Sequence, residues 1–309
     1  MQNLNVLEAS VPQVAATLTK KSPRPRHSAV AEPWKRSWFY CAPGEISTFG
    51  WLVLLHAAAL TGLVLVPSLG GSLWPGWPVA ISAVALTILG GLGTTVCYHR
   101  SLTHGGVQLR PFAENVLIFF AMLNGSGKPS TWVANHRLHH SSSDTDEDIS
   151  SPMQGGFWWA HLRWLWQAGQ APVARYAPDL ERPIYRFWGA MQVPILALSF
   201  FGGLYFGVAA CLWLGPLRLL WALHAQCTIN SVCHFGDSKA IGGSSKNVWW
   251  LAPLHFLQGE NWHRNHHEEP TDARLGQSKI QLDLGWWSIM ALKFCGLAAR
   301  IRRPRATSS

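Results

Sequence analysis

Four apolar stretches constrain the fold of this chain more than any other feature. They cover residues 46–67, 77–97, 188–214 and 216–235, and none contains an acidic residue. As a helix, each is long enough to cross a hydrocarbon core about 30 Å thick. The sequence therefore predicts an all-α integral membrane protein with four transmembrane helices, arranged as two hairpins, and a helical cap outside the membrane.

The composition supports a membrane protein. Only 13% of the residues are charged and 48% are hydrophobic, a balance unusually low in charge for a soluble domain. The 18 tryptophans point the same way, because indole rings prefer the boundary between headgroups and hydrocarbon. The six cysteines are scattered without a Cys-x-x-Cys pair, so neither a disulfide framework nor a zinc ribbon is expected.

The positive charges indicate which way the chain crosses the membrane. Of the 25 Lys and Arg residues, all but Arg218 lie in the N-terminal tail, in residues 98–187 or in residues 236–309. With four spans these segments share one side, which the positive-inside rule makes the cytosol. Arg218 is then expected at the opposite mouth, the end of the spans that faces away from the cytosol. The net charge of +9 is attributed to membrane contact, because the chain has no nucleic-acid-binding motif.

The two ends of the chain differ in composition from its middle. Residues 1–45 are predicted to be a disordered cytosolic tail, without the apolar segment of a secretory signal peptide. An organelle transit peptide is the alternative for this tail. Residues 46–299 are predicted to form one domain, and residues 300–309 a basic tail.

Histidines form two copies of one pattern, His-x-x-His-His. The copies are His136, His139 and His140, and His263, His266 and His267. Positions i, i+3 and i+4 share a face of a helix, so each copy can aim three imidazoles at a single spot. Six imidazoles exceed the four ligands of a structural zinc ion, which favours a site for two metal ions.

A separate histidine pair, His99 and His104, comes before both patterns in the sequence. We call it the first histidine pair. Residues five apart on an ideal helix point about 140° away from each other. Both rings can face one site only if the helix ends or kinks, and Gly105 and Gly106 supply a stop.

The type of ligand does not select the metal, because imidazole suits iron, zinc, copper and nickel alike. The setting favours paired iron, since a centre at the cytosolic ends of apolar spans can meet an acyl chain and attack its C–H bonds. A metal transporter without catalysis is the alternative from another class. Transporters place their ligands near the midplane on broken helices, whereas these patterns lie outside or at the ends of the spans.

Five motifs together resemble the membrane fatty acid desaturases, in particular the Δ9 branch that includes stearoyl-CoA desaturase and bacterial acyl-lipid desaturases. They are His-Arg-Ser-Leu-Thr-His from residue 99, His-Arg-Leu-His-His-Ser-Ser-Ser-Asp-Thr-Asp from 136, Gly-Phe-Trp-Trp-Ala-His from 156, Asn-Ser-Val-Cys-His from 230 and Gly-Glu-Asn-Trp-His-Arg-Asn-His-His from 259. The resemblance covers residues 90–295. The chain departs from the family at Asp148-Ile149-Ser150, where relatives often carry Asp-Pro-His, and at Arg264, Glu268 and Glu269.

The resemblance implies an oxidoreductase with two non-haem iron ions. Such an enzyme uses dioxygen and two electrons to introduce a cis double bond, at Δ9, into a saturated acyl chain. The implied iron ligands are His99, His104, His136, His139, His140, His234, His263, His266 and His267. His234 belongs to neither pattern but ends the fourth span, and Asn230 lies one helical turn before it. We expect Asn230 to hold a water on the iron with fewer ligands, and no catalytic residue separate from the metal site.

The implied partners are a fatty acyl substrate, the lipid bilayer and a separate electron donor of the ferredoxin, rubredoxin or cytochrome b5 type. A separate donor is expected because the chain has no His-Pro-Gly-Gly haem motif. The acyl carrier stays open among CoA, lipid and acyl carrier protein. A di-iron lipid or alkane hydroxylase or ketolase is the alternative activity. The expected location is a bacterial inner membrane, or the endoplasmic reticulum in a eukaryote.

The remaining histidines are not predicted to be ligands. His27 lies in the tail, and His56 and His224 lie within spans, where each is expected to bond to a neighbouring helix. His161 and His255 are expected to support the site or the core. Four carboxylates follow His140 closely. They either accept the outer N–H of ligating histidines or form a solvated loop; they are Asp144, Asp146, Glu147 and Asp148.

Overall fold

The computed structural model of the protein describes residues 32–236 and 244–303. Most of the predicted N-terminal tail, including His27, and the end of the basic tail lie outside the described residues. The last part of the N-terminal segment differs from the prediction of disorder. It contains the short helix η1 (Pro33–Lys35), and its backbone carbonyls at Ser37 and Tyr40 accept hydrogen bonds from the side-chain amide of Gln167. The side chain of Gln167 therefore holds this segment in place.

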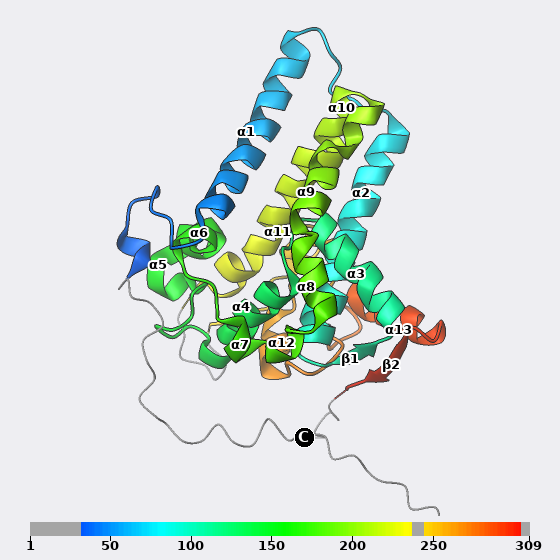
Figure 1. Cartoon of the computed structure of the whole chain (residues 1–309). Coiled ribbons are helices and arrows are strands. Elements are labelled where there is room, and N and C mark those ends of the chain that lie inside the picture. The colour runs from blue at the N-terminus through cyan, green and yellow to red at the C-terminus, as the bar shows by residue number, and fades with distance from the viewer. Residues whose placement is uncertain (1–31, 237–243, 304–309) are drawn as a thin grey trace, which may run out of the picture. The chain divides into compact units, whose positions relative to one another are not determined.

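Among the described residues, three helices are long and apolar enough to cross a membrane, in agreement with the predicted helical membrane protein. They are α1 (Ile46–Ser68), α2 (Trp77–Leu92) with its π-helical continuation η2 (Gly93–Thr103), and the continuous helix Val208–Cys233. A fourth candidate is a bent pair, Pro183–Ala190 and Gln192–Phe206, with an angle of 40° between its parts. Figure 1 shows these helices extending to the same side of the remaining structure.

The second pair of apolar helices turns at a different place from the predicted one. The sequence predicted spans over residues 188–214 and 216–235, but the chain reverses at Gly207, whose φ is 103°. The turn lies at Gly207 because the backbones on its two sides pack closely against each other. A Cβ added at Gly203 would lie 2.6 Å from Cα of Cys211, and one added at Gly215 would lie 2.3 Å from the carbonyl oxygen of Phe200. Two antiparallel segments can approach this closely only where a side chain is missing.

The elements of this hairpin are short because the helices are irregular. The ascending arm comprises α8 (Pro183–Ala190), α9 (Gln192–Phe201) and η5 (Gly202–Phe206). The descending arm comprises α10 (Val208–Leu212), the π-helix η6 (Trp213–Leu217) and α11 (Arg218–Cys233). Pro216 therefore does not end a helix. It lies within η6, where a wide turn accommodates the missing backbone N–H of proline.

Arg218 is buried between helices, so its predicted place at the opposite mouth is wrong. Its guanidinium donates to Oδ1 of Asn124 at 2.9 Å, to the carbonyl of Leu123 at 3.0 Å, to the carbonyl of Leu214 at 2.7 Å and to the hydroxyl of Ser199. A charge within apolar spans is costly unless its donors are paired. Arg218 thereby connects α11 to the C-terminal end of α3 (Pro111–Leu123).

The first histidine pair lies on and just after the π-helix. The backbone N–H of His104 bonds to the carbonyl of His99 at 3.2 Å, an i to i+5 bond that closes one π turn. Residues five apart then lie near the same face, so the helix neither stops nor kinks between the two rings. The predicted stop does follow them, because Gly105 has a φ of 61°.

The other histidine motifs lie on two helices beside the spans. Helix α4 (Pro129–Ser142) carries the first His-x-x-His-His pattern, and α12 (His263–Glu268) carries the second. The remaining elements are α5 (Pro152–Trp158), η3 (Trp159–Arg163), α6 (Trp164–Gln167), α7 (Val173–Tyr176), η4 (Pro178–Leu180), η7 (Trp249–Leu251) and α13 (Leu284–Phe294). A small antiparallel sheet of β1 (Val107–Leu109) and β2 (Ala298–Ile301) was not predicted.

A buried core and a buried ion pair hold η2 in position. Val96 and Tyr98 of η2 pack in one cluster with Ile118 of α3 and Val133 of α4. The guanidinium of Arg100 lies 2.9 Å from the carboxylate of Asp283, and both side chains are fully buried. Asp283 also caps α13 by accepting a bond from the N–H of Trp286. The residue next to His99 is thus fixed to the C-terminal part of the chain.

We predict that Gly93→Ala destabilises the protein. A Cβ at this position would lie 2.3 Å from the carbonyl oxygen of Leu117 and 2.6 Å from the backbone nitrogen of Ala121, and forcing extra volume into a packed core costs about 1–3 kcal/mol. Thermal unfolding in detergent should show a clearly lower midpoint. Gly50→Ala is the matched control, because nothing lies within 4 Å of its added Cβ. Equal midpoints for the two variants would contradict the packing of η2 on α3.

Candidate metal centre

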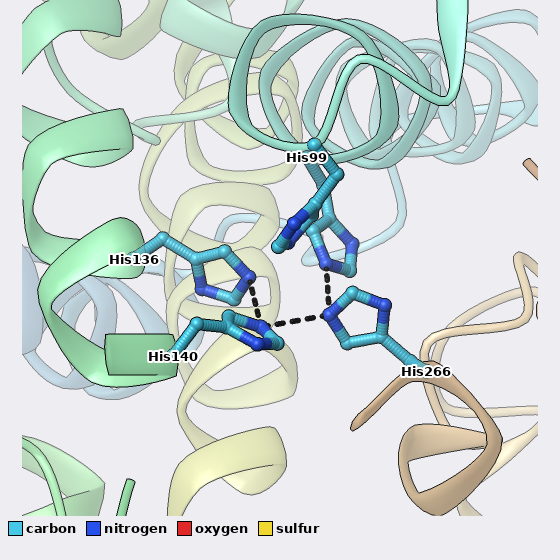
Figure 2. Close-up of side chains that lie close together, drawn as sticks. His99, His136, His140 and His266 are labelled. Carbon is cyan, nitrogen blue, oxygen red and sulfur yellow. Dashed lines mark hydrogen bonds between the residues drawn. The ribbon is translucent and has the colours of Figure 1, made fainter. Parts of the chain in front are cut away.

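Nine histidines gather into two neighbouring groups. Within each group the candidate ligand nitrogens lie within 4.8 Å of one another. The first group contains His99, His104, His136, His140 and His266, and the second contains His139, His234, His263 and His267. Figure 2 shows side chains of the first group pointing toward one another from η2, α4 and α12. The structure therefore brings together every histidine that the sequence singled out, including His234.

Each His-x-x-His-His pattern serves both groups, so the expectation that its three rings meet at a single spot is wrong. On α4, His136 and His140 belong to the first group while His139 belongs to the second. On α12, His266 belongs to the first group while its two partners belong to the second. A helix turns about 100° per residue, so positions i+3 and i+4 diverge to opposite sides of position i. Two facing helices can thus divide their rings between two centres.

Some ring nitrogens lie within hydrogen-bond distance of two other ring nitrogens at once. Nε2 of His266 is 2.9 Å from Nε2 of His99 and 2.8 Å from Nε2 of His140. In the second group, Nε2 of His267 is 3.3 Å from Nε2 of His139. A neutral ring nitrogen carries either one hydrogen or one lone pair, so it bonds poorly to two others. Two ligands at right angles, each about 2.1 Å from an ion, are about 3.0 Å apart. The donor set therefore fits one metal ion in each group.

An unpaired nitrogen supports the same fit. Nε2 of His104 is buried and has no hydrogen-bond partner among the described residues. Burying a polar atom without a partner is costly. A metal ion in the first group would satisfy this nitrogen.

Carboxylates bind the outer nitrogens of three of the rings. Nδ1 of His139 lies 2.8 Å from Oδ2 of Asp148, and Nδ1 of His234 lies 3.2 Å from Oδ2 of Asp144. Such a contact keeps the proton on Nδ1 and leaves the lone pair of Nε2 directed into the group. Of the four carboxylates that follow His140, Asp146 instead accepts a hydrogen bond from the side chain of Gln154. The alternative of a purely solvated acidic loop is therefore wrong for Asp144 and Asp148.

The departure from the family pattern at residue 150 has a local role. The backbone N–H and the hydroxyl of Ser150 both donate to Oδ1 of Asp148, at 3.0 and 3.1 Å. The backbone N–H of Asp144 donates to Oδ2 at 3.0 Å. Burial raises the pKa of Asp148, but the charge of His139 and these hydrogen bonds outweigh burial and lower the pKa. Asp148 is thus held as the carboxylate that His139 requires.

Sequence reasoning assigned no role to Glu260, the third carboxylate. Its Oε2 lies 2.9 Å from Nδ1 of His99, and Oε1 accepts a hydrogen bond from the hydroxyl of Thr95. Although burial raises its pKa, the neighbouring His99 and Arg100 and the Thr95 bond lower the pKa to about 2. Its place three residues before His263 was the available signal.

Burial keeps most of the rings neutral. It lowers the pKa of His136, His263 and His266 well below the ordinary value, and the neighbouring imidazoles lower it further. His139 differs, because the charge of Asp148 outweighs burial and raises its pKa. Neutral imidazole is the form that binds a metal, so His136, His263 and His266 are in the form that binds at neutral pH.

A cavity of about 220 Å³ leads from the histidines into the spans. His99, His136 and His139 line one part of it, and Leu55 of α1 and Leu219 of α11 line another. Asn230, one helical turn before His234, also lines it. A long apolar ligand in this cavity would pass directly beside both histidine groups.

The other described histidines lie outside both groups. His56 of α1 and His224 of α11 face each other with their Nε2 atoms 3.2 Å apart, which confirms the expected bond between helices. His255 bonds through Nε2 to the hydroxyl of Thr228 at 3.0 Å. His161 bonds to His224 and Ser231. None of the four is placed to join the two centres.

The spans and the histidine groups define a membrane protein with a candidate two-metal centre beside an apolar cavity. The family described as fatty acid desaturase matches residues 72–280. Delta-9 acyl-lipid desaturase 1 of Arabidopsis thaliana is 34% identical over 236 residues, which cover 74% of this chain and 76% of that protein. The sn-1 stearoyl-lipid 9-desaturase of Anabaena variabilis is 36% identical over 234 residues, 72% of this chain and 84% of that protein.

A third relative, the icosanoyl-CoA 5-desaturase of Limnanthes douglasii, is 33% identical over 285 residues, 88% of this chain and 75% of that protein. The chain belongs to the fatty acid desaturase family. It is an oxidoreductase that desaturates fatty acyl chains, as its motifs predicted.

We predict that Asp148→Asn weakens metal binding in the second group. An amide cannot accept the Nδ1–H of His139 with the strength of a carboxylate, and loss of such a partner typically lowers metal affinity about 10- to 100-fold. Metal analysis after dialysis against a weak chelator should show a partial loss of metal per chain. Asp146→Asn is the control, because Asp146 is exposed and contacts Gln154 instead. Equal metal content in both variants would refute the role of Asp148.

Proposed function

We propose that this chain is a Δ9 acyl-lipid desaturase that uses two iron ions and dioxygen to introduce a cis double bond. The observation that carries the proposal is the position of nine histidines, in two groups, beside a cavity that continues between apolar spans. Two of the relatives are named for Δ9 desaturation of lipid-bound acyl chains. The third is named for a CoA substrate and another position, so both carrier and position are tested below.

The proposed ligands of one iron are His99, His104, His136, His140 and His266, and those of the other are His139, His234, His263 and His267. Bound iron would supply the activation of dioxygen that cleavage of an unactivated C–H bond requires. The choice of iron rests on the family, because imidazole ligands suit several metals.

The chain's own residues position the substrate and the ligands. Glu260, Asp148 and Asp144 hold the Nδ1 protons of three rings, so that Nε2 of each stays available to the metal. Trp132 stacks on His136 at 4.9 Å between ring centroids and lines the cavity. We propose that Asn230 holds a water at the second iron, which has four protein ligands, and so keeps a position open there.

The proposed topology has four spans, with the bent pair α8 and α9 as the third. Residues 46–299 then form the desaturase domain, and the cap with all three histidine motifs faces the cytosol. A bacterial inner membrane, or the endoplasmic reticulum in a eukaryote, is the proposed location. Electrons are proposed to come from a separate ferredoxin, rubredoxin or cytochrome b5 type of protein.

Expression in a host that lacks its own desaturase tests the function. Monounsaturated fatty acids with the double bond between carbons 9 and 10 should appear in the lipids, and not with the His266→Ala variant. Mass spectrometry separates the alternatives, since desaturation removes two hydrogens while hydroxylation adds one oxygen. Products that gain oxygen would replace the desaturase with the hydroxylase, and a double bond elsewhere would refute Δ9.

We predict that Asn230→Ala and His234→Ala differ in their effects. Loss of His234 removes a proposed ligand, so metal content should fall and turnover should be abolished. Loss of Asn230 removes a group that orients a water, so metal content should persist while turnover falls at least about 10-fold, as for other oriented catalytic donors. If His234→Ala keeps two irons and normal turnover, its assignment as a ligand is wrong.

The topology predicts that residues 72 and 278 lie on opposite sides of the membrane. Both are exposed serines, one between α1 and α2 and the other before α13. In a background with Cys41→Ser and Cys295→Ser, an impermeant maleimide should label Ser72→Cys in intact cells and Ser278→Cys only after permeabilisation. Labelling of both in intact cells would rule out the four-span arrangement.

A further inference from the structure

Three histidines outside the metal centre form a continuous ladder of hydrogen bonds. Nδ1 of His161 lies 2.9 Å from the hydroxyl of Ser231, and Nε2 of His161 lies 2.9 Å from Nδ1 of His224. Nε2 of His224 lies 3.2 Å from Nε2 of His56. The ladder ends where Nδ1 of His56 lies 2.7 Å from the carbonyl oxygen of Leu52. It therefore links η3, α11 and α1.

Neutral rings satisfy the whole ladder with one arrangement of protons. His56 must donate from Nδ1, because a carbonyl oxygen only accepts, so its Nε2 accepts from His224. His224 then accepts at Nδ1 from His161. Nδ1 of His161 is left as an acceptor toward the hydroxyl of Ser231, which also lies 2.9 Å from the carbonyl oxygen of Cys227. Burial and the nearby His224 lower the pKa of His161 to about 4, in keeping with a neutral ring. The ladder thus connects three elements without placing a charge in the membrane.

Residues next to the ladder histidines form one wall of the cavity. Leu223 and Cys227 flank His224 on α11, Leu55 adjoins His56 on α1, and all three line the cavity. Trp164 of α6 lines it too, and its Nε1 has no hydrogen-bond partner among the described residues. We use the term α1–α11 seam for residues 51–56 of α1 and residues 219–227 of α11, which face each other across this wall.

Helix α1 is the least buried of the three long apolar helices that the structure describes. Only 17% of its apolar window is buried, against 44% for the span that ends at Thr103 and 50% for the one that ends at Cys233. Figure 1 shows α1 at one edge of the helices. A small cluster of Leu55, Phe200 and Leu219 and the contact between His56 and His224 hold the seam. Polar contacts between helices in a membrane are weak, so the contact between His56 and His224 can open and close.

We propose that the acyl chain of a membrane lipid enters the cavity sideways through the α1–α11 seam, and that the histidine ladder is the latch that closes the seam behind it. The proposal rests on the proposed function and specifies its substrate as a lipid that stays in the bilayer. Val53 and Leu54 on α1 are exposed, so this face contacts hydrocarbon in a membrane. An acyl chain of a bilayer lipid already lies at this depth, whereas a water-soluble carrier would have to deliver its chain from the cap.

A reversible bridge across the seam tests the proposal. His56→Cys and His224→Cys are introduced in a background with Cys41→Ser, Cys211→Ala and Cys295→Ser, which leaves only buried native cysteines. A short bifunctional methanethiosulfonate then joins the two positions, and dithiothreitol releases them. Turnover of a stearoyl phospholipid in vesicles should fall at least 10-fold on bridging and return on release, with metal content unchanged. In the two variants with one introduced cysteine, His56→Cys alone and His224→Cys alone, the same treatment should change turnover less than twofold.

The outcomes separate the entrance from the activity. Unchanged turnover of the bridged protein would overturn the sideways entrance while leaving the desaturase function intact. An equal loss of turnover in a variant with only one introduced cysteine would also overturn the sideways entrance, because modification of that cysteine alone would then explain the effect. Labelling gives a second readout without turnover. A phospholipid with a diazirine on its acyl chain should label residues 219–227 from within the cavity in the released protein and several-fold less in the bridged one, and equal labelling would refute the seam even if the chain proved inactive.

Discussion

The packing of nine imidazoles into one buried volume is the constraint on which the rest of this structure depends. Their nitrogens approach within about 3 Å of one another, a separation that protonated rings would not tolerate because like charges repel strongly in a medium of low dielectric constant. Burial keeps most of the rings neutral, and three carboxylates fix which nitrogen of their partner ring carries the proton. Every helix that contributes a histidine must therefore be held in place independently of the metal.

Buried polar anchors and missing side chains provide that support. Arg100 and Asp283 join η2 to the segment before α13, while Arg218 joins α11 to the end of α3. Glycines allow the close approaches: Gly93 lets η2 lie against α3, and Gly203 and Gly215 let the two arms of the second hairpin pack backbone to backbone. Wide π turns then adjust which face each helix presents. In η2 the wide turn brings His99 and His104 to the same group, although their spacing suits an ordinary helix poorly.

The arrangement explains how a membrane enzyme can act on an apolar chain. The cavity begins at the histidines and continues between α1 and α11, so the part of a substrate that reaches the centre stays in apolar surroundings. Asn230 is proposed to act at the junction of the two environments. The same geometry makes the loosely packed α1 the natural moving part, since displacing it disturbs neither histidine group directly. A lipid-bound chain would then reach the centre without leaving the bilayer.

The sequence by itself determined the class of the protein, the first two spans and the complete set of converging histidines. A long apolar segment without charges indicates a membrane helix, and α1 and the helix that continues through η2 begin at the expected residues 46 and 77. Histidines spaced three and four residues apart indicate one face of a helix. Only the tertiary structure decided how each pattern divides between two groups, where the second hairpin turns, that Arg218 is buried and that Glu260 supports His99. These features depend on what a side chain or backbone meets on another helix. Periodicity along one helix describes the direction of a residue but not its partner, and close backbone approaches at Gly203 and Gly215 arise only when distant segments pack together.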